Sequence, residues 1–248
     1  MKARIGVITF PGSCDDRDAL HAVEQLGGEA VPLWHDDSDL DGCTGVIVPG
    51  GFSYGDYLRA GAIARFAPMM REVETFAAAG GPVLGICNGF QVLCEAGLLP
   101  GVLRPNHHGR FVCRDVDLVV HAEGSPWLAG LEPGAVLRIP VKHHDGAWYA
   151  PPDEQERVES GGQVALRYAD NPNGALADIA CVTNAAGNVC GLMPHPEHAV
   201  DEALGPVGGR PLLQGLLALA RTHKRAKVAA PDLARAAAGD GEGGAAGI

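Results

Sequence analysis

The chain has 248 residues, of which 46% are hydrophobic and 20% charged, so a sizeable core is expected and a wholly disordered chain is excluded. Its formal net charge of −11, with no basic block before THKRAK, disfavours a nucleic-acid binder. No apolar run approaches the roughly 20 residues that span a bilayer, and acidic residues closely follow the first apolar run. We therefore expect a soluble cytoplasmic protein with no membrane partner.

Short apolar strands alternate with helical patterns in the first hundred residues. Strands are expected at 4–10, 29–34, 45–51 and 82–87, and helices at 15–26, 65–79 and after 87. Pro68 should lie in the first turn of the second helix, and Gly97 should end the third. This alternation favours a parallel sheet with helices on both faces, where ligands bind beyond the carboxyl ends of the strands.

The second half of the chain is richer in strands. They are expected at 111–120, 136–141, 163–169, 179–184 and 188–194, and a last helix at 211–227. We predict an α/β, flavodoxin-like fold whose mostly parallel sheet has antiparallel additions from this half. It should form a single domain over 1–227, followed by a flexible Ala/Gly-rich tail over 228–248.

A strand, a tight turn and a helix surround Cys87 in GICNG, with Gly85 two residues before it and Gly89 two residues after it. This spacing is typical of a nucleophile elbow, a turn that leaves no room for side chains beside its central residue. The thiol would lie at a helix N-terminus, where the helix dipole favours the thiolate. A tight turn around an inert buried thiol is the alternative, and the motif alone does not decide between them.

The other cysteines lack this pattern. Cys94 lies in the apolar pattern of the following helix and is expected in the core. Cys181 and Cys190 should face each other across a hairpin, although a reducing cytosol disfavours a disulfide between them. A metal site built on His195-x-x-His198 is also disfavoured, because the chain has no H-E-x-x-H motif and no C-x-x-C pair.

A thiol nucleophile needs a base, and ten histidines compete for this role. His195 has a distinctive setting, because it lies between two prolines in MPHPEH, directly after an expected strand. Glu197 follows two residues later, so in an extended segment both side chains leave the same face. The carboxylate could then orient the imidazole, as in a Cys–His–acid triad. A rigid proline loop with surface polar groups is the alternative.

GICNGFQVL together with PHPE resembles the class I glutamine amidotransferases, and PGGFSYGDYLRAGAIARF over 49–66 is more specific. This segment resembles the glutaminase subunits of phosphoribosylformylglycinamidine synthase, and further motifs extend the resemblance over residues 3–223. The resemblance implies that Cys87 forms a glutamyl thioester, that His195 is the base, and that Glu197 orients it. It implies the class I glutamine amidotransferase fold as well.

The resemblance also implies roles around the nucleophile. The backbone of Gly50 and Gly51 and the N–H of Asn88 would face the oxyanion, and Gln91 would contact the glutamine substrate. His143 lies in a loop that resembles a substrate-contacting loop of the family.

The sequence departs from the family pattern in three places. The loop reads His143-His144-Asp145-Gly146 where His-Gly-Glu-Gly is expected, which leaves the roles of His143 and Asp145 open. His198 stands where arginine is usual after PHPE. GSCDD replaces the usual GSNCD. None of these changes falls on the expected triad.

The resemblance implies that the chain hydrolyses glutamine to glutamate and ammonia. The ammonia would pass to a large PurL-type synthetase subunit, assisted by a small PurS-type subunit, for the ATP-dependent conversion of FGAR to FGAM in purine biosynthesis. ATP and Mg²⁺ are expected on the synthetase subunit, and no cofactor or metal in this chain. Two alternatives stay open: a cysteine hydrolase or chaperone of the DJ-1/PfpI kind, and a non-catalytic, amidotransferase-like regulatory subunit.

Overall fold

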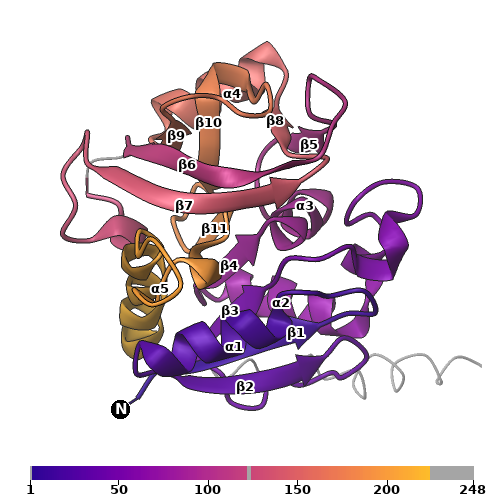
Figure 1. Ribbon diagram of the computed structural model, residues 1–248. Helices are drawn as coiled ribbons and strands as arrows, with labels where there is room; N and C mark the ends of the chain where they lie inside the picture. Colours follow the sequence, from indigo (N-terminus) through magenta and orange to yellow (C-terminus); the bar gives the residue numbers. More distant parts are fainter. Residues whose placement is uncertain (1, 122–123, 224–248) are drawn as a thin grey trace, which may run out of the picture.

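The computed structural model describes residues 2–121 and 124–223; the expected tail over 228–248 lies outside them. One mixed sheet has the strand order β2-β1-β3-β4-β11-β10-β9-β6-β7 (Figure 1). Its parallel part consists of β1 (Arg4–Thr9), β2 (Glu29–Trp34), β3 (Gly45–Val48), β4 (Val83–Ile86) and β11 (Val189–Leu192). Its antiparallel part consists of β10 (Ile179–Thr183), β9 (Val164–Tyr168), β6 (Val112–Val120) and β7 (Val136–His143). The predicted fold class is therefore confirmed.

Helices cover both faces of the parallel part (Figure 1). They are α1 (Asp16–Gln25), α2 (Pro68–Ala78), α3 (Asn88–Glu95) and α5 (Arg210–Thr222). A Cβ added to Gly45 of β3 would meet side chains of α5, whereas Val48 of the same strand contacts Gly89 of α3. Because successive strand residues point to opposite faces, α3 and α5 lie on opposite sides of β3.

Two predicted helix boundaries need correction. The helix predicted over 65–79 begins at Pro68, after a separate 3-10 turn over Ala64–Phe66, because Ala67 before the proline is extended with ψ 144°. The last helix ends at Thr222, because His223 is extended, and the remainder of its predicted range, 224–227, lies outside the described residues.

Several short elements were not predicted at all. They are α4 (Pro152–Ser160), the two-stranded sheet of β5 (Val102–Arg104) and β8 (Ala147–Tyr149), and the 3-10 turns η1 (Ser53–Asp56), η3 (Pro126–Leu128), η4 (Leu176–Asp178) and η5 (Pro196–His198). Only one residue of α4, Val158, is buried, so this helix has no apolar stripe in its sequence.

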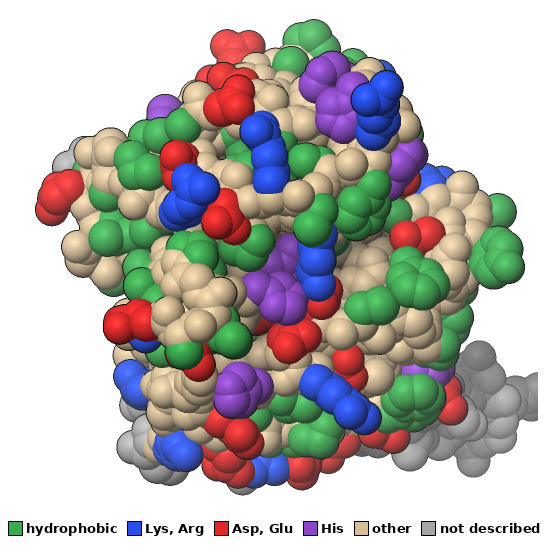
Figure 2. Space-filling model, in the orientation of Figure 1, with side chains coloured by type: hydrophobic (Ala, Val, Ile, Leu, Met, Phe, Trp, Pro, Cys, Tyr) green, Lys and Arg blue, Asp and Glu red, His purple; other side chains and the backbone are tan. Residues whose placement is uncertain are grey.

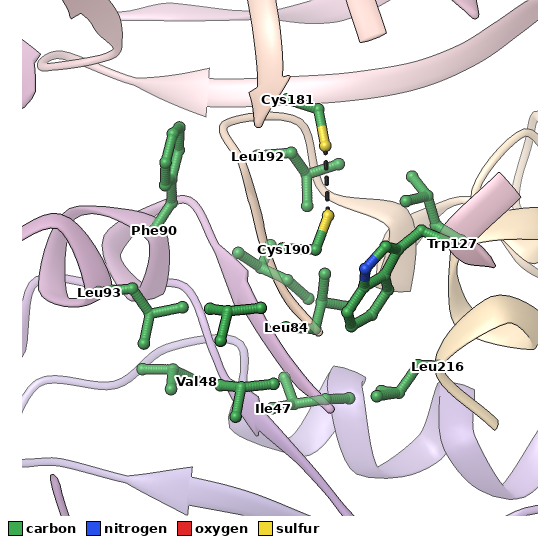
Figure 3. Close-up of a cluster of buried hydrophobic side chains, with 14 of the residues drawn as sticks. Ile47, Val48, Leu84, Phe90, Leu93, Trp127, Cys181, Cys190, Leu192 and Leu216 are labelled. Carbon is green, nitrogen blue, oxygen red and sulfur yellow. Dashed lines mark hydrogen bonds between the residues drawn. The ribbon is translucent and has the colours of Figure 1, made fainter. Parts of the chain in front are cut away.

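The core lies between the sheet and its helices (Figure 3). Cys181 and Cys190 are fully buried there and face each other as predicted, with their sulfur atoms 3.3 Å apart as free thiols. Cys94 is only partly buried, because its thiol lies at the edge of the core and donates to the carbonyl of Pro100. The prediction that Cys94 belongs to the core therefore holds in part.

The order of the strands brings distant segments of the chain together at the carboxyl ends of β4 and β11. β4 pairs with β11 in parallel, with Ile86 beside Leu192. Cys87 follows β4 directly, and its N–H donates to the carbonyl of Leu192 at 2.8 Å. His195 follows β11, and its N–H donates to the carbonyl of Pro140 in β7. The two residues therefore emerge where the parallel and antiparallel parts of the sheet meet.

In the described part of the chain, no helix is both long enough and apolar enough to cross a bilayer.

Candidate active site

Cys87 occupies a strained turn between β4 and α3. Its φ of 50° and ψ of −106° are rare for a residue with a side chain, and strain of this kind concentrates at functional sites. A Cβ on Gly89 would lie 1.8 Å from the carbonyl oxygen of Val48, so only glycine fits there. The predicted elbow is therefore present, with glycine required by the close approach of α3 to β3.

The Cys87 thiol lines a cavity of about 370 Å³ that also touches Gly51, Gln91, His143 and His195. The side chain is 6% exposed, and its Sγ lies 3.8 Å from the carbonyl oxygen of Lys142, to which the thiol donates. On the face shown in Figure 2, histidine, basic and acidic side chains gather in a hollow near the middle of the molecule. A small polar substrate can reach the thiol through this cavity.

His195 and Glu197 form a buried pair beside this cavity. Nδ1 of His195 lies 2.6 Å from Oε1 of Glu197, and the Nδ1–H donates to the carboxylate, which fixes the tautomer. The other ring nitrogen, Nε2, makes no hydrogen bond of ordinary geometry to any residue that the structure describes. It is therefore the nitrogen left for proton transfer. The geometry brings together the three residues of the predicted triad.

The charges around His195 favour its protonated form. Burial lowers the pKa of the imidazole, but the negative charges of Glu197 and of the Cys87 thiolate outweigh burial and raise that pKa above its ordinary value. His195 can therefore hold a proton on Nε2 as well as on Nδ1.

Backbone and amide groups border the nucleophile. The N–H of Asn88 is the first of α3 and has no acceptor within the helix. The Asn88 side chain accepts from the N–H of Ser53 at 3.0 Å, which ties the elbow to the segment after β3. Gly50 and Gly51 lie at the end of β3, and Gly51 lines the cavity. The start of α3 and the segment after β3 therefore border the same cavity.

Gln91 is held at the cavity wall by hydrogen bonds from both ends of its side-chain amide. Its Nε2 donates to the carbonyl of Asp145 at 2.6 Å, and its Oε1 accepts from Asn88 Nδ2 at 2.9 Å. The same Asn88 amide donates to Asp56 at 3.0 Å. Gln91 thus lines the cavity and at the same time holds the 143–146 loop against the elbow.

His143 is a buried, neutral histidine at the cavity wall. Burial lowers its pKa to about 3, with a further contribution from His195. Because Asn106 Oδ1 accepts from the N–H of Gly146, we assign the His143 Nδ1–H as a second donor to that oxygen, at 3.1 Å. This assignment leaves Nε2 as a lone-pair acceptor. The imidazole can accept a hydrogen bond from a ligand but not carry charge at neutral pH.

The sequence did not indicate two charged residues of the site, Asp15 and Lys142. Their side chains form an ion pair, and His198 Nε2 lies 3.2 Å from the same Asp15 oxygen. The end of the first expected strand and the departure from the family pattern at GSCDD pointed near Asp15, but neither assigned it a role. Donor atoms of Asp15, His195, Glu197 and His198 lie within 4.8 Å of one another, a spacing at which a metal ion could bind. Contacts among these residues and with Lys142 already account for the arrangement.

The chain is similar to known glutamine amidotransferases over most of its length. A sequence profile of the CobB/CobQ-like glutamine amidotransferase domain matches residues 2–209. A phosphoribosylformylglycinamidine synthase subunit PurQ from Rubrobacter xylanophilus is 57% identical over 218 residues, which cover 88% of this chain and 99% of that relative. This chain belongs to the PurQ family of glutamine amidotransferases. A PurQ from Mycobacterium bovis is 58% identical over 206 residues, covering 83% of this chain and 92% of the relative.

Solved structures agree with the PurQ assignment. A chain in the structure of PurLQS from Thermotoga maritima superposes with a TM-score of 0.81 at 44% identity, covering 88% of this chain and 99% of that one. A GMP synthase protein from Thermoplasma acidophilum, at 17% identity and a TM-score of 0.58, shares the fold over 89% of this chain and 95% of its own. Membership of the PurQ family decides against the DJ-1/PfpI-like alternative.

Proposed function

We infer that this chain is the glutaminase subunit of a phosphoribosylformylglycinamidine synthase. It hydrolyses glutamine to glutamate and ammonia and supplies the ammonia to a synthetase subunit, which converts FGAR to FGAM with ATP. One observation carries the assignment: Cys87 on its strained turn and the His195–Glu197 pair meet in one cavity in a chain of the PurQ family. A non-catalytic regulatory subunit would have no reason to keep this arrangement.

We propose that the first half-reaction begins with attack of the Cys87 thiolate on the carbonyl carbon of the glutamine side chain. The new C–S bond places negative charge on the carbonyl oxygen, which the backbone N–H groups of Asn88 and Gly51 would stabilise. The C–N bond then breaks as Nε2 of His195 gives its proton to the leaving nitrogen, so ammonia departs and a glutamyl thioester remains.

In the second half-reaction His195 is neutral and acts as a base. Nε2 takes a proton from water, the resulting hydroxide adds to the thioester carbonyl, and the C–S bond breaks. Glutamate leaves and the thiolate–imidazolium pair is restored. Glu197 keeps Nδ1 protonated in both halves, so that Nε2 always faces the reaction.

The partners follow from the same chemistry. This reaction needs a nucleophile, a base and water, so we propose that ATP and Mg²⁺ bind to the PurL-type synthetase subunit and that this chain works without a cofactor of its own. A PurS-type small subunit completes the complex, in keeping with the PurLQS assembly of the Thermotoga maritima relative. Because the partner reaction consumes ATP, we expect the complex in the cytoplasm.

The experiment that tests this function compares two cysteine variants in the assembled complex. Cys87→Ser should abolish glutamine-dependent FGAM synthesis and leave ammonia-dependent synthesis near the wild-type rate. Cys94→Ser is the matched control, because Cys94 lies on α3, the helix that Cys87 precedes, and its thiol only donates to a carbonyl, a bond that serine can keep. Retention of glutamine-dependent synthesis by Cys87→Ser, or its loss in a folded Cys94→Ser, would contradict the assignment.

A further inference from the structure

Asp15 directs a buried carboxylate at His195 instead of capping its own helix. It occupies the N-cap position of α1, where an aspartate usually accepts hydrogen bonds from the first N–H groups of the helix. Its side chain makes no such bond. It is 3% exposed, and its Oδ2 lies 3.6 Å from Nδ1 of His195. The carboxylate therefore belongs to the active site rather than to the helix end.

The neighbouring backbone is shaped around this approach. A Cβ on Gly50 would lie 2.3 Å from Oδ2 of Asp15 and 2.8 Å from Cε1 of His195. Both Cys14 and Asp15 donate their N–H groups to the carbonyl of Gly50, at 3.1 and 3.2 Å. Because Gly50, just after β3, has no side chain, the Asp15 carboxylate and the His195 imidazole can both pack against it. The hydrogen bonds hold the loop before α1 in place.

Asp15 also has a counter-ion from the other half of the sheet. Its Oδ1 pairs with Nζ of Lys142 on β7 and accepts from Nε2 of His198 at 3.2 Å. The backbone carbonyl of Lys142 accepts from the Cys87 thiol. One residue of β7 therefore contacts Asp15 through its side chain and the nucleophile through its backbone.

We propose that Asp15 is a positioning residue for His195, with Lys142 as its counter-ion. Glu197 accepts the hydrogen bond from Nδ1, and the Asp15 carboxylate lies 3.6 Å from the same nitrogen, where its negative charge holds the imidazole in place and favours its cationic form. The inference rests on the proposed function, since it concerns the same thiolate–imidazolium pair.

Because Asp15 and Lys142 carry opposite charges, the proposal predicts opposite shifts in the pKa of His195 when one or the other charge is removed. The titratable groups that face His195 are Glu197, Asp15, Cys87, His143 and His198, and Lys142 is ion-paired with Asp15 beside them. Asp15→Asn removes a negative charge close to the imidazolium, which weakens proton binding, and Lys142→Met removes a positive charge, which strengthens it. A residue that only supports the fold would not produce opposite shifts.

The test measures glutamine-dependent kcat/KM against pH in the assembled complex, where the alkaline limb reports loss of the His195 proton. Asp15→Asn should move this limb down by about one pH unit, and Lys142→Met should move it up. The double variant should lie between the two. Asp18→Asn, an exposed acid of the same helix, is the matched control and should leave the limb in place.

An unchanged alkaline limb of the pH profile in Asp15→Asn, or limb shifts of the same sign in both variants, would overturn the proposal. Thermal unfolding of each variant checks that it is folded, and if Asp15→Asn does not fold, the direction of the Lys142→Met shift decides. The Cys87→Ser complex distinguishes failure of the proposed function from failure of the proposal about Asp15. If Cys87→Ser loses glutamine-dependent synthesis while Asp15→Asn keeps the wild-type profile, only the role of Asp15 fails.

Discussion

Gly85 and Gly89 face each other across the turn that carries Cys87. A Cβ on Gly85 would lie 2.9 Å from the carbonyl carbon of Gly89, and a Cβ on Gly89 would collide with the backbone of β3. The two glycines are therefore needed because the end of β4, the start of α3 and the neighbouring strand pack backbone to backbone. This close packing holds Cys87 in its strained conformation.

Gly89→Ala should consequently disrupt the elbow. The added methyl group would need a shift of α3 away from β3, and overpacking of this kind costs about 1–3 kcal/mol or more. We expect a lower unfolding temperature and loss of most glutamine-dependent synthesis. Gly97→Ala at the end of α3 is the control, because a Cβ there meets open space, and its positive φ of 71° should cost only about 1 kcal/mol. Equal behaviour of the two variants would contradict the packing argument.

His195 and Glu197 should differ in the size of their contributions. His195→Ala removes the proton carrier and should lower glutamine-dependent kcat by about 10²- to 10⁴-fold. Glu197→Gln leaves the base in place but no longer fixes its tautomer, so the loss should be smaller. Steady-state kinetics with glutamine, and with ammonia as the control substrate, measure both. A larger loss in Glu197→Gln than in His195→Ala would argue against the assigned roles.

Gln91 should act on substrate binding through the loop that it holds. Gln91→Met removes the hydrogen bonds to Asp145 and Asn88 while keeping the volume of the side chain. We expect KM for glutamine to rise roughly tenfold, which corresponds to about 1.4 kcal/mol, with a smaller effect on kcat. Gln214→Met, on the exposed side of α5, should change neither constant. An unchanged KM in Gln91→Met would contradict this role.

His143 should make the protein less stable in mild acid. Burial lowers the pKa of its imidazole to about 3, whereas the unfolded chain binds a proton near the ordinary value of 6.5. Between these values the unfolded state binds more protons, so stability falls as pH falls. From pH 6.5 to 4.5 this histidine should contribute a loss of roughly 2 kcal/mol.

Urea unfolding of the wild type and of His143→Gln at several pH values measures this contribution. The glutamine variant cannot titrate, so the difference in unfolding free energy between the two proteins should change steadily over this range in favour of the variant. A difference that is constant with pH would show that His143 does not titrate as the structure predicts.

Local patterns predicted the strands of the large sheet and the three residues of the expected triad because each depends on a short stretch of sequence. GICNG and PHPE carry Cys87, His195 and Glu197, and the buried strands are continuous apolar runs. Asp15 and Lys142 lie 127 residues apart and meet only through the sheet topology, so neither segment identifies the pair alone. Helix α4 escaped prediction because it buries only Val158 and has no apolar stripe.

The order of the strands has a consequence for the protein while it is being made. β11 lies between β4 and β10, so one edge of the strand that leads to Cys87 stays unpaired until this late segment leaves the ribosome. His195 and Glu197 follow β11 directly. A nascent chain that ends before β11 therefore carries Cys87 without the proposed base and without one of the strands that flank β4, so we expect no glutamine hydrolysis before residues 189–197 have been synthesised.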